Sequence, residues 1–245
     1  SKGCPYTCFY YCVYPMQQGR KLRLKNPKKV VDEMIYFYQK LNVNNYIFRD
    51  PVFSIDKKHT KLLCEEIIKS KIKFNIAIET HLKNIDNELA DIFLKCGIKL
   101  IYVGIESAGE DVRNNAKRWS DENDVQMEKI NYLEKIGIKI KTMYIIGFPE
   151  ENKEKFLKTV KYATKVNSSY AQFSVFTPYP GTPVYKEYEK KITAKRFEDF
   201  NQWKLVFKHK YFDEISVRNL LDFAFKKYYL RFSWIKKFLI NKLIS

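Results

Sequence analysis

Short apolar runs and longer amphipathic stretches alternate along most of the chain, from Asn26 to about Gly181. The short runs are rich in β-branched and aromatic residues and predict buried strands, while the longer stretches repeat their apolar positions with a helical period. The predicted strands are Asn45–Phe48, Phe74–Ile78, Leu100–Gly104, Lys139–Ile146 and Ala171–Thr177. The predicted helices span residues 27–41, 56–71, 85–96, 121–136 and 152–166.

The order of these elements predicts the fold. Strand and helix alternate five times, which is typical of repeated βαβ units around a parallel sheet. Because the count is too low for a closed eight-stranded barrel, we expect an α/β fold built as a partial (β/α)6 TIM-type barrel. Cys4 stands almost at the start of the sequence, so we expect that the first strand of the barrel belongs upstream and is lacking here.

The pattern changes near residue 185. Residues 186–245 are aromatic and basic, and within them Leu220–Ile244 predicts one or two basic amphipathic helices. We therefore expect a core at residues 1–185 and a mostly helical C-terminal extension at residues 186–245. Two interpretations of these helices stay open: they cover the end of the barrel, or they form a peripheral membrane contact with anionic lipid.

The charge of the chain narrows the choice of partners only slightly. It carries 45 Lys+Arg against 28 Asp+Glu, a formal net charge of +17. Such an excess is typical of proteins that bind nucleic acid or a membrane surface. Only eight of the 45 cations are arginine, however, and nucleic-acid sites usually need arginine for bidentate contacts. A nucleic-acid partner therefore stays open but is not favoured.

The cysteines indicate a reduced compartment, which we expect to be the cytoplasm. Three of the five cysteines lie within the first twelve residues, whereas a secreted disulfide scaffold spreads its cysteines more evenly. The sequence shows no signal-peptide pattern and no uncharged apolar run long enough to span a membrane. The two remaining cysteines, Cys64 and Cys96, lie on apolar faces of predicted helices and are expected in the core.

Cys4, Cys8 and Cys12 form a cluster of soft ligands on one loop. Three thiolates at such spacing suit a soft metal or an iron–sulfur cluster. Structural zinc normally takes four ligands, and no fourth Cys or His lies nearby in the sequence. Three ligands would leave one iron of a [4Fe-4S] cubane open to a substrate or cofactor.

The cysteine loop and the motifs that follow it resemble the radical S-adenosylmethionine (SAM) superfamily, and especially the branch that often carries an N-terminal cobalamin-binding domain. The further matches, in chain order, are Val13-Tyr14-Pro15, Gly19-Arg20-Lys21-Leu22-Arg23, Asn26-Pro27, Glu79-Thr80-His81, Gly104-Ile105-Glu106-Ser107, Ile145-Ile146-Gly147-Phe148-Pro149-Glu150 and Pro178-Tyr179-Pro180-Gly181-Thr182. One feature departs from the family, whose usual spacing is Cys-x3-Cys-x2-Cys. Here Tyr11 stands at the expected third position and Cys12 follows it, so we expect the loop to absorb one extra residue.

The resemblance implies a [4Fe-4S] cluster on Cys4, Cys8 and Cys12 that cleaves S-adenosyl-L-methionine to a 5′-deoxyadenosyl radical at the carboxyl ends of the strands. It also implies the residues that bind SAM: Tyr11, Gly147 and Phe148 near the adenine, Asp50 facing the ammonium group, Glu106 and Ser107 at the ribose or amino group, and Lys117 with Arg118 at the carboxylate. The alternative for each of these is a structural role, such as loop packing, helix capping or a solvated charge.

Three hypotheses of function result. The first is a radical SAM enzyme of the cobalamin-linked branch, with cobalamin held by an upstream domain and used for methyl transfer or rearrangement. The alternative is a radical SAM tRNA-modifying enzyme, similar to the methylthiotransferases, although residues 184–245 lack the strand pattern of their usual RNA-binding barrel. The third is a non-catalytic metal-binding interaction protein. The first hypothesis implies a small-molecule substrate and an electron donor such as flavodoxin or ferredoxin.

Overall fold

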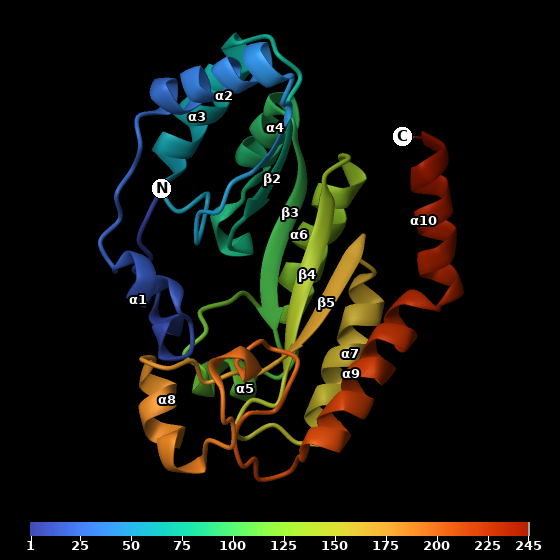
Figure 1. Cartoon of the computed structure of the whole chain (residues 1–245). Coiled ribbons are helices and arrows are strands. Elements are labelled where there is room, and N and C mark those ends of the chain that lie inside the picture. Colours follow the sequence, from blue (N-terminus) through green and yellow to red (C-terminus); the bar gives the residue numbers. More distant parts are fainter. Residues whose placement is uncertain (245) are drawn as a thin grey trace.

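Five parallel strands form one sheet in a computed structural model, which describes residues 1–244 apart from the side chains of Phe9 and residues 241–244. The strands are β1 (Asn45–Ile47), β2 (Asn75–Glu79), β3 (Ile98–Glu106), β4 (Lys139–Ile146) and β5 (Tyr170–Val175). They pair in chain order, β1-β2-β3-β4-β5, and every pair is parallel. The sheet curls into a half-barrel (Figure 1), which confirms the predicted α/β partial barrel. All the carboxyl ends of the strands therefore meet at one edge.

A helix connects each strand to the next, as the periodicity predicted. These helices are α3 (Lys57–Lys69), α4 (Asn87–Cys96), α6 (Asn123–Lys135) and α7 (Lys153–Val166), and α2 (Pro27–Leu41) precedes β1. Short helices absent from the prediction are α1 (Tyr14–Gln18), α5 (Glu110–Asn115) and α8 (Pro183–Tyr188), with single turns η1 (Thr7–Tyr10), η2 (Leu82–Asn84), η3 (Glu189–Lys191) and η4 (Phe197–Asp199). The side chains of Asn26, Asp56 and Asn152 cap their helices by accepting main-chain amides.

The core lies between one face of the sheet and the helices that cover it. Alternate residues of β4 are fully buried there, for example Ile140 and Ile146, and α6 and α7 pack against this strand. Side chains on the other face, such as Lys141 and Met143, are only half-buried. The period of two along the strand thus separates a packed outer face from the inner face of the half-barrel.

The chain after α8 is less helical than expected. Residues 192–213 hold only the turn η4 and an isolated antiparallel bridge between Ile192 and Phe207. Two helices follow, α9 (Glu214–Tyr229) and α10 (Phe232–Ile244). They agree with the one or two helices predicted over Leu220–Ile244, except that α9 begins at Glu214. Helix α9 packs against β5 and α7 (Figure 1), so it belongs to the same packed layers as the barrel helices. The expected domain boundary at residue 185 stays a prediction.

Candidate active site

The cysteine loop accommodates its extra residue in a single helical turn. The turn η1 carries Cys8, and the amide of Cys12 donates to the carbonyl oxygen of Cys8 at 3.0 Å. Residues four apart on a helical turn share a side, and the thiols of Cys8 and Cys12 hydrogen-bond to each other. Cys4 is held beside them because its amide donates to the carbonyl oxygen of Gly19 at 3.1 Å.

The three thiols differ in acidity. The thiol of Cys12 donates to Cys8 and is the main cause that lowers the pKa of Cys8 to about 7; burial opposes this effect and the positive charge of Arg118 adds to it. The same hydrogen bond, together with burial, raises the pKa of Cys12. Burial also raises the pKa of Cys4. Cys8 is therefore the most readily ionised of the three, and the thiolate is the form that binds metal.

Arg118 links this loop to the end of β3. Its Nη2 donates to the carbonyl oxygen of Gly104 at 2.6 Å, and its Nε lies 3.8 Å from Oε1 of Glu106. The guanidinium also hydrogen-bonds to Cys8. The Nε atom is buried and has no hydrogen-bond partner among residues 1–244. A buried donor without a partner is well suited to the acidic group of a ligand.

Glu106 has an unusual backbone conformation at the last position of β3. Its φ is 68°, and the register of β3 on β4 shifts between Gly104 and Glu106. The carboxylate folds back over Gly104, where a Cβ atom would lie 2.4 Å from Oε1 of Glu106. A left-handed residue other than glycine costs about 1–2 kcal/mol, which the contacts of the carboxylate with Arg118 and Tyr11 offset. Burial raises the pKa of Glu106, while Arg118 and the Tyr11 hydroxyl oppose that shift.

Aromatic rings form a wall beside the cysteine loop. The ring of Tyr11 meets that of Phe148 edge to face, with 5.8 Å between centroids, and Phe176 lies 4.9 Å from Phe148 and 6.0 Å from Tyr11. Phe148 follows β4 and Phe176 follows β5. Gly147, directly before Phe148, is held in place because its amide donates to Oε2 of the buried Glu151 at 2.8 Å. Tyr11 of the cysteine loop thus shares one side of the site with Gly147 and Phe148, which belong to the motif after β4.

Two further predicted SAM contacts differ in their surroundings. Asp50 is buried after β1, and its contact with the SAM ammonium group stays a prediction. Ser107 is fully buried; its hydroxyl accepts the amide of Gly109 at 3.1 Å and lies 3.2 Å from the hydroxyl of Thr159. Ser107 therefore fixes the loop after β3 to α7, and a contact with SAM stays a prediction that this geometry does not favour.

Lys117 borders the site but does not enter it. Its carbonyl oxygen accepts the hydroxyl of Thr7 at 3.0 Å, and its ammonium group lies 5.2 Å from the ring centroid of Tyr10. The neighbouring Arg118, rather than Lys117, reaches Cys8 and the end of β3. The predicted role of Lys117 at the SAM carboxylate stays a prediction.

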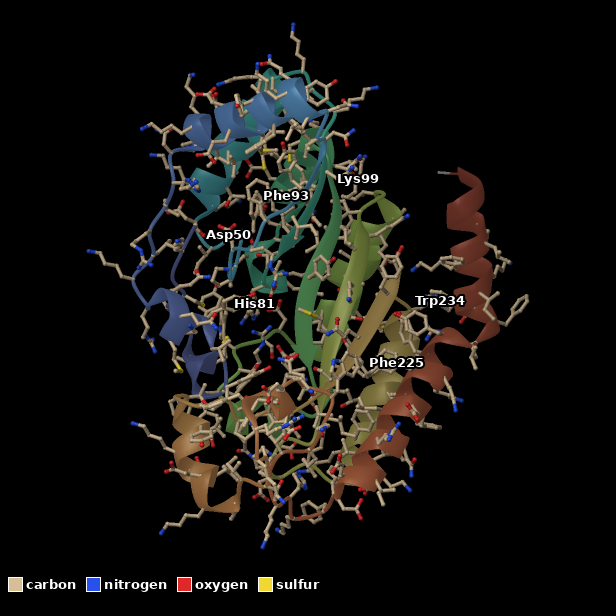
Figure 2. The ribbon with its side chains drawn as sticks, in the orientation of Figure 1. Asp50, His81, Phe93, Lys99, Phe225 and Trp234 are labelled. Carbon is tan, nitrogen blue, oxygen red and sulfur yellow. The ribbon has the colours of Figure 1, made fainter. Side chains whose placement is uncertain are left out.

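Sequence reasoning missed a second group of contacts around the loop. The hydroxyl of Tyr14 donates to Oε2 of Glu79 at 3.4 Å, while the ring of Tyr6 lies 5.7 Å from His81 and 5.5 Å from Trp119. Burial, and then the charge of Arg118, lowers the pKa of His81 to about 3, so its imidazole is neutral. The available signal was the motif Glu79-Thr80-His81, which begins at the last residue of β2 and had been given no role. Figure 2 shows Asp50 and His81 between α1 and the strands.

The donor set fits an iron–sulfur cluster. Among residues 1–244, no three Cys, His, Asp or Glu side chains converge on the site of a single ion. A cubane cluster takes its thiolates on different irons, so its ligands surround the cluster rather than meet at one point. Cys4, Cys8 and Cys12 offer three soft thiols on one loop, and the ionisable Cys8 lies beside the cation of Arg118, which is the donor chemistry that such a cluster needs.

The fold and this site define a half-barrel protein with a thiol-rich centre at the carboxyl edge of its parallel sheet. Comparison with known proteins gives the family: residues 1–163 match the model of the Radical SAM superfamily. The chain belongs to this superfamily.

Similar proteins are named methyltransferases and cyclases. An uncharacterised methyltransferase of Pyrococcus horikoshii is 26% identical over 94% of this chain and 50% of its own length. The anaerobic magnesium-protoporphyrin IX monomethyl ester cyclase of Rubrivivax gelatinosus is 28% identical over 99% of this chain and 42% of its own length. A solved radical SAM methyltransferase, TsrM from Kitasatospora setae with cobalamin and a [4Fe-4S] cluster bound, superposes with a TM-score of 0.68 at 20% identity, over 77% of this chain and 38% of that one. The chain spans half or less of the length of each of these proteins.

Proposed function

We propose that the protein binds a [4Fe-4S] cluster through Cys4, Cys8 and Cys12 and cleaves SAM reductively at that cluster. The observation that carries the proposal is the convergence of Cys8, Arg118 and Glu106, which joins the thiol loop to the carboxyl end of β3. When bound, the cluster would supply the electron that breaks a carbon–sulfur bond of SAM.

The residues of the chain would bind and orient the two groups. The buried Nε of Arg118 has no hydrogen-bond partner within residues 1–244 and suits the carboxylate of SAM. Glu106 offers a carboxylate to the SAM amino group or the ribose hydroxyls. Tyr11 and Phe148 present an apolar wall for the adenine, and this wall would also exclude water from a reactive intermediate.

Methyl transfer that uses cobalamin is the reaction we propose for the whole protein. Similar proteins are named methyltransferases, and a solved relative of this fold binds cobalamin. Cobalamin would be held by a part of the protein outside this sequence. The same proposal includes a small-molecule substrate bound on the inner face of the half-barrel and an electron donor such as flavodoxin or ferredoxin.

The test is anaerobic reconstitution with iron and sulfide, followed by incubation with SAM and dithionite. The parent protein should produce 5′-deoxyadenosine, and Cys8→Ala should abolish both iron uptake and product. Cys64→Ala, a buried cysteine on α3 far along the chain from the loop, is the matched control and should retain both. A parent that takes up iron but never cleaves SAM would favour the non-catalytic metal-binding alternative, and RNA that copurifies with an active enzyme would favour tRNA modification.

Arg118→Gln tests the binding role separately from cluster assembly. The loss of one charge-assisted hydrogen bond, worth about 1.5–3 kcal/mol, should weaken SAM binding by about 10- to 100-fold while iron uptake persists. Arg218→Gln, an exposed arginine on α9, should leave SAM binding unchanged. Equal SAM affinity in Arg118→Gln and the parent protein would remove Arg118 from the site.

A further inference from the structure

Helix α10 presents its apolar side to solvent. It contacts the rest of the protein through Trp234 (Figure 2), whose Nε1 donates to the carbonyl oxygen of Ser169 at 2.9 Å. It also does so through Lys237, whose ammonium group pairs with Glu134. A different side of the helix from that of Trp234 and Lys237 carries Phe232, Ile235 and Leu239. Packed helices usually turn a charged face outward and an apolar face inward. In α10 the charged side chain of Lys237 faces the protein instead.

The exposed apolar side chains form a continuous series along α10. Their exposed fractions are 79% for Phe232, 39% for Ile235 and 53% for Leu239, and these residues are spaced as on one helical face. Leu230, directly before α10, is 71% exposed. Single exposed apolar residues are ordinary on a protein surface, but a series of this kind marks a docking surface.

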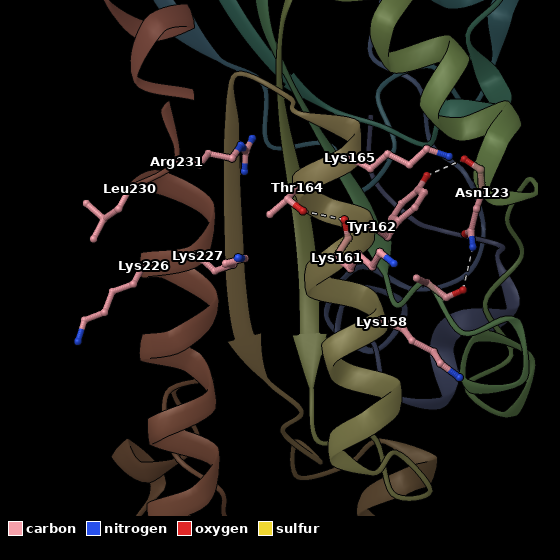
Figure 3. A pocket seen from close by; sticks show the side chains of 11 residues that line it. Asn123, Lys158, Lys161, Tyr162, Thr164, Lys165, Lys226, Lys227, Leu230 and Arg231 are labelled. Atoms are coloured by element: carbon pink, nitrogen blue, oxygen red, sulfur yellow. Dashed lines mark hydrogen bonds between the residues drawn. The ribbon is translucent and has the colours of Figure 1, made fainter. Parts of the chain in front are cut away.

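The chain around this apolar face is rich in cations. Between residues 223 and 244 the sequence holds six Lys and Arg and no Asp or Glu. A groove of about 880 Å³ between α7 and α9 adds Lys158, Lys161 and Lys165 to Lys226, Lys227 and Arg231 (Figure 3). Within residues 1–244, Lys161, Lys226 and Lys227 have no carboxylate within salt-bridge distance. The groove reaches Leu230 and Arg231, immediately before the apolar face begins.

We propose that α10 and the adjoining cationic groove dock the protein on the surface of an anionic lipid bilayer. Phe232, Ile235 and Leu239 would enter the region between headgroups and acyl chains, and the lysines would contact lipid phosphates. The contact is peripheral, since none of the helices described within residues 1–244 has the length and apolar character needed to cross a membrane.

Charge and side-chain chemistry favour lipid over the other occupants. A symmetric second copy would bring the same cations face to face, and like charges in an interface oppose association. A nucleic acid would be attracted by the lysines, but the aliphatic side chains of Ile235 and Leu239 offer no stacking surface for bases. An anionic bilayer uses both the apolar face and the cations.

The experiment is cosedimentation of the protein with vesicles of phosphatidylcholine, with and without phosphatidylglycerol, at low and high salt. The protein should bind only the vesicles that contain phosphatidylglycerol, and salt should weaken the binding. The double variant Ile235→Ser/Leu239→Ser should lose at least about tenfold in binding, as should Lys226→Glu/Lys227→Glu. Ile215→Ser, an exposed residue at the start of α9 (73% exposed), is the control for a general loss of apolar surface and should bind as the parent does.

Three results would overturn the proposal. The parent protein could bind neither kind of vesicle, or both kinds equally. The double variants could bind like the parent while circular dichroism shows all of them folded. Light scattering could reveal a dimer of the parent that Ile235→Ser/Leu239→Ser dissociates, or an RNA could compete for the lysines without any vesicle binding; either would assign the surface to that other occupant.

Discussion

The buried carboxyl group of Glu151 makes a quantitative prediction about stability and pH. Glu151 lies in the loop after β4 and is fully buried. Its Oε2 accepts the amide of Gly147 at 2.8 Å, and its Oε1 has no hydrogen-bond partner within residues 1–244. Burial raises the pKa of this carboxyl group to about 8, although the amides of Gly147 and Phe148 oppose the shift.

The raised pKa fixes the direction of the pH dependence. Between pH 4.5, the ordinary pKa of a glutamate, and about pH 8, Glu151 keeps its proton in the folded protein and loses it in the unfolded chain. Stability contributed by the protonated form is therefore present below about pH 4.5 and is lost as the pH rises toward 8. The gap of about 3.5 pH units corresponds to on the order of 5 kcal/mol, since each unit is worth about 1.36 kcal/mol.

Glu151→Gln isolates this effect because glutamine keeps the shape and one acceptor oxygen but cannot ionise. The free energy of unfolding in urea should be measured from about pH 5 to pH 9. The metal-free chain is used because loss of a cluster would disturb a two-state transition. As the pH rises, the free energy of unfolding of Glu151→Gln should increase relative to that of the parent. Most of this change should occur below pH 8. Glu150→Gln, the exposed neighbour, should give a curve parallel to the parent. A parallel curve for Glu151→Gln as well would refute the reasoning.

Two further predictions concern the folded framework. Tyr228→Phe should lower the free energy of unfolding by about 1–2 kcal/mol, because the buried Tyr228 hydroxyl bonds both the carbonyl oxygen and the hydroxyl of Ser168; urea titration measures this, and an unchanged midpoint would contradict it. Gly97→Ala should destabilise far more than Gly137→Ala, by several kcal/mol against about 1 kcal/mol. Both have positive φ, but a Cβ at Gly97 would lie 2.2 Å from the carbonyl oxygen of Phe74. A Cβ at Gly137 would have Cδ1 of Leu94 as its nearest neighbour, at 3.9 Å. Similar melting temperatures for the two variants would count against that reading.

The strands were predictable because each combines β-branched residues with a following turn, and β4 was predicted with its observed bounds. The end of β3 was not predictable in this way. Its pairing continues through a bulge to Glu106, two residues beyond the predicted end at Gly104. A bulge depends on the side chains that surround it, here Arg118 and Tyr11, and these come from other parts of the chain.

The C-terminal helices show what periodicity leaves open. The start of α9 at Glu214 is set by Asp213 and Ser216, which form a capping box, a local signal that the prediction did not use. Periodicity does place Phe232 and Ile235 on one helical face. It cannot tell whether that face meets the protein or the solvent, because the answer depends on the partners that Trp234 finds in the folded chain.

The site was predictable only to the edge of the sheet. Parallel strands bring their carboxyl ends together, so the grouping of Tyr11, Glu106 and Phe148 followed from the motifs. The resemblance placed Arg118 with Lys117 at the SAM carboxylate. The contacts of Arg118 with Cys8 and Glu106 did not follow, because it lies twelve residues beyond the end of β3 on a loop with no periodic pattern. Ser107, adjacent to Glu106, was predicted to contact SAM. Its hydroxyl points toward α7 instead.

The most direct test of the account is the iron content of the anaerobically reconstituted protein, read together with the electron paramagnetic resonance spectrum of its reduced form. We expect about four irons per chain and a spectrum that changes when SAM is added. Replacement of Cys4, Cys8 or Cys12 by alanine should remove the signal, and Cys64→Ala should preserve it. A parent protein that takes up no iron, or a spectrum that does not respond to SAM, would contradict the central claim.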